Sequence, residues 1–80
     1  MIYNHRDVYR IIAKTLNCKE EELNACSGLT RTLNWDSLNH VIILSSIETH
    51  FGIQIPDEMF VILTSIGKII DFLDTYHKKI

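Results

Sequence analysis

The stretch WDSLNHVIILSSIETHFGIQIPDE, residues 35–58, determines the fold expected of this chain. Asp36 is a favourable residue to precede a helix, because its carboxylate accepts a hydrogen bond from a free backbone N–H group of the first turn. Gly52 can adopt the left-handed conformation that ends many helices. Between them, apolar residues recur at the spacing of one helix face, at Ile43, Leu44, Ile47 and Phe51. The stretch therefore predicts a helix over residues 37–51, with Ser37 in its first turn.

Helical patterns also lie on both sides of this stretch. Residues 4–16 have an apolar stripe at helical spacing, and Asn4 is a suitable N-cap for them. A brief helix is expected over residues 57–62, where two acidic residues stand in the first turn. A last helix is expected to begin at a Thr64 or Ser65 cap.

A long connection separates the first two helices. Residues 17–35 lack helical periodicity and are rich in turn-forming residues, so they predict a loop with a short helical turn over residues 20–23. The candidate buried anchors of this loop are Leu23, Leu29, Leu33 and Trp35, of which Trp35 is the largest. Gly67, inside the last helix, would permit a close crossing of two helices. The expected fold class is all-α: a small four-helix bundle of three longer helices and one short third helix, with a long loop between helices 1 and 2.

Length and charge exclude several classes of function. The chain has 80 residues, of which eight are Lys or Arg and ten are Asp or Glu, for a net charge of −2. This balance offers no basic surface for nucleic acid. No apolar run is long enough for membrane insertion or typical of a signal peptide. We expect a free-standing cytoplasmic domain over residues 1–80, with Cys18 and Cys26 as free thiols and no metal site.

Several motifs at fixed spacing resemble those of a known family. Asp36-Ser37-Leu38 is followed by Phe51-Gly52-Ile53, by Ile55-Pro56-Asp57-Glu58 and by Thr64-Ser65-Ile66. In this register the sequence resembles an acyl carrier protein of the free-standing type over nearly its whole length. The resemblance implies that Ser37 bears covalent 4'-phosphopantetheine, transferred from coenzyme A by a separate phosphopantetheinyl transferase, and that the thiol carries acyl groups as thioesters. It also implies that Asp36 flanks the site as a cap and transferase contact, and that the chain has no catalytic residue.

Apolar residues around the serine suggest where partner enzymes bind. Leu38 and Val41 are neighbours on one helix face beside Ser37. Because the second helix has few acidic residues and the third is apolar, we expect recognition by shape and apolar area, in a specialised lipid or secondary-metabolite pathway. The partners would be acyl-loading, acyl-transfer or condensing enzymes, and the carrier a monomer. The expected docking surface consists of Leu38, Val41, Ile42, Met59, Val61 and Ile62. The competing expectation is that the third helix is tilted, so that its apolar residues are buried in the core.

Other functions fit part of the pattern. An aminoacyl or peptidyl carrier shares the bundle and the serine, whereas a non-carrier interaction module would use Asp36 only as a helix cap. A hydrolase would need Asp36, Ser37 and His40, but Asp36 is placed at the cap instead of behind the imidazole, and no oxyanion hole is evident. His40 is therefore expected at the solvated surface. A further apolar group would either shield a carried acyl chain or form ordinary core, and it consists of Ile43, Ile47, Phe60 and Leu63.

Overall fold

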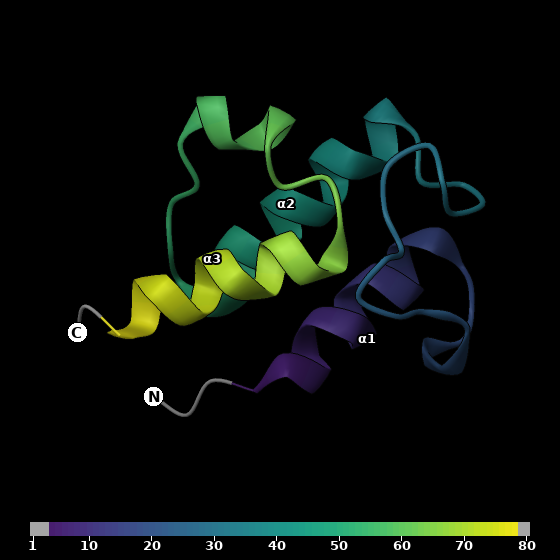
Figure 1. Ribbon diagram of the computed structural model, residues 1–80, viewed down its shortest axis with the longest axis horizontal. Helices are drawn as coiled ribbons and strands as arrows, with labels where there is room; N and C mark the ends of the chain where they lie inside the picture. Colours follow the sequence, from purple (N-terminus) through teal and green to yellow (C-terminus); the bar gives the residue numbers. More distant parts are fainter. Residues whose placement is uncertain (1–3, 79–80) are drawn as a thin grey trace.

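The structure is a computed structural model that describes residues 4–78. Its element order is α1 (His5–Leu16), η1 (Glu20–Glu22), α2 (Ser37–Phe51), η2 (Asp57–Val61) and α3 (Ile66–Lys78), where η denotes a 3₁₀ helix (Figure 1). Over residues 4–78 the only β-type pairing is an isolated bridge between Gly28 and Ser65. The all-α prediction is confirmed for this part of the chain.

The predicted count of four helices is not confirmed, because the segment expected as the short third helix is the 3₁₀ helix η2. The Met59 N–H donates to the Pro56 carbonyl at 2.9 Å and the Ile62 N–H to the Met59 carbonyl at 3.0 Å, which is the i to i+3 pattern of a 3₁₀ helix. In so short a segment, the few hydrogen bonds of an α-helix would not offset the conformational entropy lost in forming its first turn. The expected turn near residues 20–23 is also 3₁₀, as η1.

Local capping explains where the α-helices begin. The Asn4 side chain accepts from the Arg6 N–H at 2.9 Å, and the Asp36 carboxylate accepts from the Asn39 N–H at 2.9 Å. At the start of α3, the Ser65 hydroxyl accepts from the Lys68 N–H at 3.3 Å. The predicted caps of all three helices are thus confirmed, with Ser65 serving at the last one.

The helix ends are equally local. Asn17 closes α1 in the left-handed conformation at φ 57°, and Gly52 closes α2 at φ 65°. Asparagine tolerates this conformation better than most residues with a side chain, which is why α1 can stop there without a glycine. The expected end of the second helix at Gly52 is confirmed.

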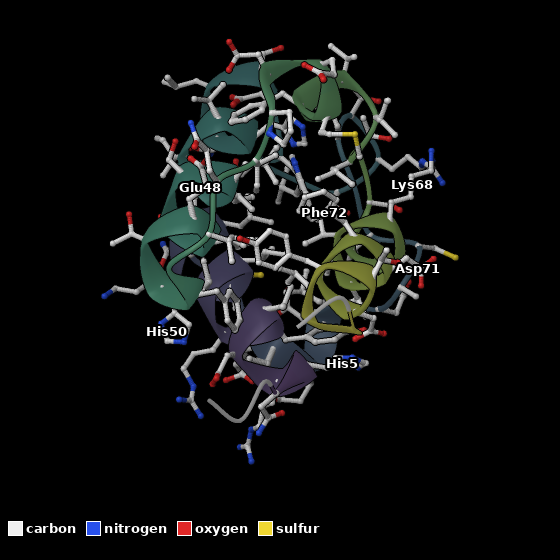
Figure 2. The ribbon with its side chains drawn as sticks, turned by 90° about the vertical axis from the view of Figure 1, so that its left-hand side faces the viewer. His5, Glu48, His50, Lys68, Asp71 and Phe72 are labelled. Carbon is white, nitrogen blue, oxygen red and sulfur yellow. The ribbon has the colours of Figure 1, made fainter. Side chains whose placement is uncertain are left out.

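Helices α1 and α2 run antiparallel and share one core with α3. The start of α1 lies beside the end of α2, where His50 Nε2 is 3.5 Å from an Asp7 carboxylate oxygen. Helix α1 packs against both α2 and α3, and Trp35, 1% exposed, anchors the loop before α2 as predicted. Figure 2 shows the other side of α3, where Lys68 and Asp71 point away from the interior. The fully buried residues include Val8, Ile12, Ile43, Leu44, Ile47, Ile66, Ile69 and Leu73.

The long loop caps the N-terminus of α3 with its own carbonyl groups. The Ile66 N–H donates to the Ser27 carbonyl at 2.9 Å, and the Gly67 N–H donates to the Ala25 carbonyl at 3.0 Å. A Cβ on Gly67 would stand 3.2 Å from that Ala25 oxygen. The expectation that Gly67 permits a crossing of two helices is therefore wrong: it accommodates the loop, whose carbonyls satisfy N–H groups that a helix start leaves free.

No helix within residues 4–78 combines the length and the apolarity needed to cross a membrane.

Candidate functional site

Ser37 is the first residue of α2, and its side chain is exposed. The residues around it are held by local hydrogen bonds. The Asp36 carboxylate accepts the Asn39 N–H at 2.9 Å, and the Asn39 side chain donates to the Asn34 carbonyl at 2.7 Å. In turn, the Asn34 side chain donates to the carbonyl of Leu16 at 3.4 Å, which ties the loop to the end of α1. The hydroxyl of Ser37 is therefore presented to solvent from a braced helix start.

The environment of Ser37 can accept a phosphate ester. A helix start leaves its first backbone N–H groups without partners inside the helix, and these groups attract an anion. The Asp36 carboxylate accepts the N–H of Asn39, so the N–H groups of Ser37 and Leu38 are the ones in the first turn that can face an anion. The negative charge of Asp36 opposes this attraction. Because Ser37 and Leu38 are both exposed, a substituent on the hydroxyl displaces no packed side chain.

His40 is buried, with 5% of its surface exposed, so its expected place at the solvated surface is wrong. Trp35 Nε1 lies 3.0 Å from His40 Nδ1, and His40 Nε2 lies 2.7 Å from the Phe60 carbonyl oxygen. Both ring nitrogens have partners other than Ser37, so the imidazole is not placed to act as a base for that hydroxyl. The sequence did contain a signal for this burial, since His40 lies on the same helical stripe as Ile43 and Ile47.

Exposed apolar residues lie on the first turns of α2, which begins at Ser37, and on η2. Leu38 is 70% exposed and Val61 is 79% exposed, and three further residues of the expected docking surface, Val41, Ile42 and Ile62, are exposed as well. Met59 differs from the others because it is half-buried and packs against the core. Leu33 in the loop is 85% exposed, so its expected place as a buried anchor of the loop is wrong. A leucine in a loop has no helical periodicity to fix its direction, so its burial depends on the fold.

The residues that might have shielded a cargo lie in the core. Ile43, Ile47 and Leu63 have almost no exposed surface, and Phe60 is half-buried against the same cluster. Tight burial of this kind is what ordinary core packing produces. The interpretation of these four residues as core is therefore the one that their burial supports.

A groove of about 810 Å³ runs between α1 and α2. Along α2 it extends from Asn39, two residues after Ser37, to His50. Its walls mix aliphatic side chains with hydroxyl, amide and basic groups. The sequence pattern did not predict this groove, because its lining comes from two helices: Ile11, Lys14 and Thr15 of α1, and Asn39, Ile42 and Ser46 of α2.

Among the side chains that the structure describes, the cysteines and histidines do not gather at a common site. Cys18 and Cys26 are free thiols, as expected. Burial, with a smaller contribution from the charge of Glu22, raises the pKa of Cys18 above its ordinary value. His5 and His50 lie apart in Figure 2, and within the residues described no three His, Cys, Asp or Glu side chains gather where they could hold a metal ion.

A comparison with known families covers most of the chain. Residues 6–73 match the family model described as the phosphopantetheine attachment site, and this range contains Ser37 and all the surface residues discussed above. The exposed hydroxyl at a helix start, with two N–H groups near it, suits a phosphodiester. The chain belongs to the phosphopantetheine attachment family, whose domains carry covalently attached 4'-phosphopantetheine, as the resemblance to acyl carrier proteins implied.

Proposed function

We propose that this chain is an acyl carrier protein modified at Ser37. The observation that carries the proposal is the exposed, braced serine at the start of α2, inside the matched range. In the transfer reaction Ser37 Oγ loses its proton to the transferase and forms a bond to the β-phosphorus of coenzyme A, while the adenosine bisphosphate portion leaves. The attached arm supplies a thiol for thioester formation. The contribution of this chain is to hold the attachment point and to bind the enzymes.

The residues next to Ser37 have distinct parts in this proposal. Asp36 holds the first turn together through the Asn39 N–H, so that the serine is offered in one orientation. The N–H groups of Ser37 and Leu38 favour the phosphodiester once it has formed. A long flexible arm on a fixed point raises the effective concentration of its cargo at each partner's active site.

The test is modification of the purified protein with coenzyme A, magnesium and a broad-specificity phosphopantetheinyl transferase. We expect the wild type to gain the mass of one arm and Ser37→Ala to gain none. Ser45→Ala is the matched control, because Ser45 is an exposed serine on the same helix, and this variant should be modified like the wild type. A wild type without a mass gain would favour a non-carrier interaction module.

We also propose that the apolar residues around Ser37 dock the partner enzymes. Leu38, Val41, Ile42, Val61 and Ile62 are exposed around the attachment point, and an apolar patch of this kind marks an interaction surface. Acidic side chains are few on α2, so charge adds little steering. This composition supports a specialised pathway, with acyl-loading, acyl-transfer or condensing enzymes as partners.

The docking surface is tested by an added charge. Val61→Glu should raise the KM of the transferase for the carrier, because the charge would have to be buried against an apolar partner. Its unfolding free energy should stay within about 0.5 kcal/mol of the wild type, since Val61 is exposed. Gln54→Glu, a similar change at an exposed position, is the control. A lower melting temperature of Val61→Glu with an unchanged KM would contradict docking.

The remaining expectations belong to the same proposal. A single core formed by residues from all three α-helices supports one domain over residues 1–80. We propose a monomeric carrier that works in the cytoplasm. Size-exclusion chromatography with light scattering, on the apo and the modified protein, tests the monomer.

A further inference from the structure

One buried polar side chain connects the attachment helix to the 3₁₀ helix η2. His40 lies three residues after Ser37, one turn further along α2. Its Nδ1 is 3.0 Å from Trp35 Nε1, and its Nε2 is 2.7 Å from the carbonyl oxygen of Phe60 in η2. The ring therefore links three segments, which are the end of the long loop, α2 and η2.

The partners determine the protonation of the ring. An indole N–H can only donate, so His40 Nδ1 must be the unprotonated nitrogen that accepts from Trp35. A carbonyl oxygen can only accept, so Nε2 must carry the proton and donate it to Phe60. This arrangement fits a neutral imidazole with its hydrogen on Nε2 and no other form. A buried side chain whose polar atoms are all hydrogen-bonded fixes the relative positions of the segments it joins.

The hydrogen bond to Phe60 is a polar link between α2 and η2, and it adds to the apolar packing of Met59 and Phe60 against the core. The backbones of these two elements make few contacts over the described residues. Phe60 is followed directly by Val61 and Ile62, which are exposed, and His40 is followed directly by Val41 and Ile42, which are also exposed. The ring thus holds the two halves of the apolar surface around Ser37 next to each other.

We propose that His40 is a positioning residue that sets η2 against the start of α2, so that the two halves form one docking surface for the enzyme that modifies Ser37. The inference rests on the proposed function. Loss of the His40 bridge frees Val61 and Ile62 to move relative to the serine without removing them. The enzyme would then bind the carrier less tightly, while the reacting hydroxyl of Ser37 is unchanged.

Two substitutions distinguish the effect of the two His40 hydrogen bonds from the effect of its packing. His40→Leu fills much of the same space but leaves the Trp35 N–H and the Phe60 carbonyl without their partner. His40→Gln is the conservative variant, because its amide has one acceptor and one donor to replace the two ring nitrogens. Ile12→Val is the control for stability, since it trims a fully buried residue of α1 away from this bridge and lowers stability modestly.

The readout is the steady-state kinetics of phosphopantetheinyl transfer, at a temperature where every variant is folded by circular dichroism. We expect His40→Leu to raise the KM for the carrier about tenfold with kcat nearly unchanged, the pattern of lost binding in the ground and transition states alike. His40→Gln should restore most of the loss. Ile12→Val should leave KM at the wild-type value although it melts earlier.

A second, spectroscopic measurement uses only the wild-type protein, so it does not depend on whether a variant folds. The ¹⁵N chemical shifts of the imidazole of His40 should show an unprotonated Nδ1 and a protonated Nε2. The opposite tautomer, or a charged ring at neutral pH, would overturn the bridge. An unchanged KM in His40→Leu, or an equal rise in Ile12→Val, would overturn the positioning role alone. A wild type that the transferase does not modify would refute the proposed function, and with it the role of His40 in docking.

Discussion

Gly28→Ala should destabilise this protein more than any other glycine substitution in it. A Cβ on Gly28 would overlap the carbonyl oxygen of Thr64 and would stand 3.1 Å from the Cα of Ser65. All of the crowded atoms belong to the backbone, so no side chain can rotate away. The long loop and the start of α3 must separate to make room.

The hydrogen bonds at this contact give the size of the effect. The Leu29 N–H donates to the Thr64 carbonyl at 2.9 Å, and the N–H groups of Ile66 and Gly67 donate to loop carbonyls at 2.9 and 3.0 Å. Each such bond contributes about 0.5–1.5 kcal/mol to stability. Loss of the set therefore costs roughly 3 kcal/mol. For a domain of this size that corresponds to a fall in Tm of more than about 10 °C.

The assay is thermal and urea unfolding followed by the fluorescence of Trp35, the only tryptophan of the chain, which is 1% exposed in the folded state. Gly52→Ala is the control. A Cβ there meets no atom within 4 Å, and the cost is only that of the left-handed conformation at φ 65°, about 1 kcal/mol. If Gly28→Ala loses no more stability than Gly52→Ala, the loop does not pack on α3 as described.

Three further changes test other contacts. Asp36→Ala removes the cap of α2 and should lower the unfolding free energy by about 1 kcal/mol, measured by urea unfolding; full retention of stability would contradict the cap. Glu48→Gln weakens the charge-assisted hydrogen bond at 2.7 Å to the backbone beyond α2, and should cost roughly 1 kcal/mol in the same assay, with no loss as the contrary result. At pH 8, iodoacetamide should alkylate exposed Cys26 before Cys18, because burial and Glu22 raise the pKa of Cys18 and leave less thiolate. The alkylation rate of Cys18 should rise with pH. Peptide mass mapping measures both rates, and equal rates at the two cysteines would contradict this prediction.

The helices and their ends follow from neighbouring residues in the chain. Asn4, Asp36 and Ser65 each cap a helix through a bond to a residue two or three positions away. Gly52 ends α2 through its own backbone conformation. Because these interactions span one turn, the sequence is enough to locate them, and the exposed Ser37 at the start of α2 is located with them.

The brief helix predicted over residues 57–62 is present as the 3₁₀ helix η2, and its type could not be predicted for a different reason. Five residues after Pro56 are too few to form an α-helix of their own, and the conformation they adopt depends on the surfaces they meet. Met59 turns toward the core while Val61 stays in solvent, which composition does not decide because both residues are apolar. The sequence therefore predicted five of the six exposed apolar residues correctly, and the fold decided that Met59 is not one of them.

His40 and Gly67 show what depends on the folded chain. A histidine on an apolar helix stripe is stable in the interior only if both ring nitrogens find partners, and these come from Trp35 and from Phe60, 20 residues away. Gly67 is required by the carbonyl of Ala25, which reaches α3 from a distant loop. The local sequence determined the helices, their caps and the exposed serine, since each depends on one turn of chain. Tertiary packing decided the buried histidine, the groove between α1 and α2 and the loop on α3, because each needs partners that only the fold brings together.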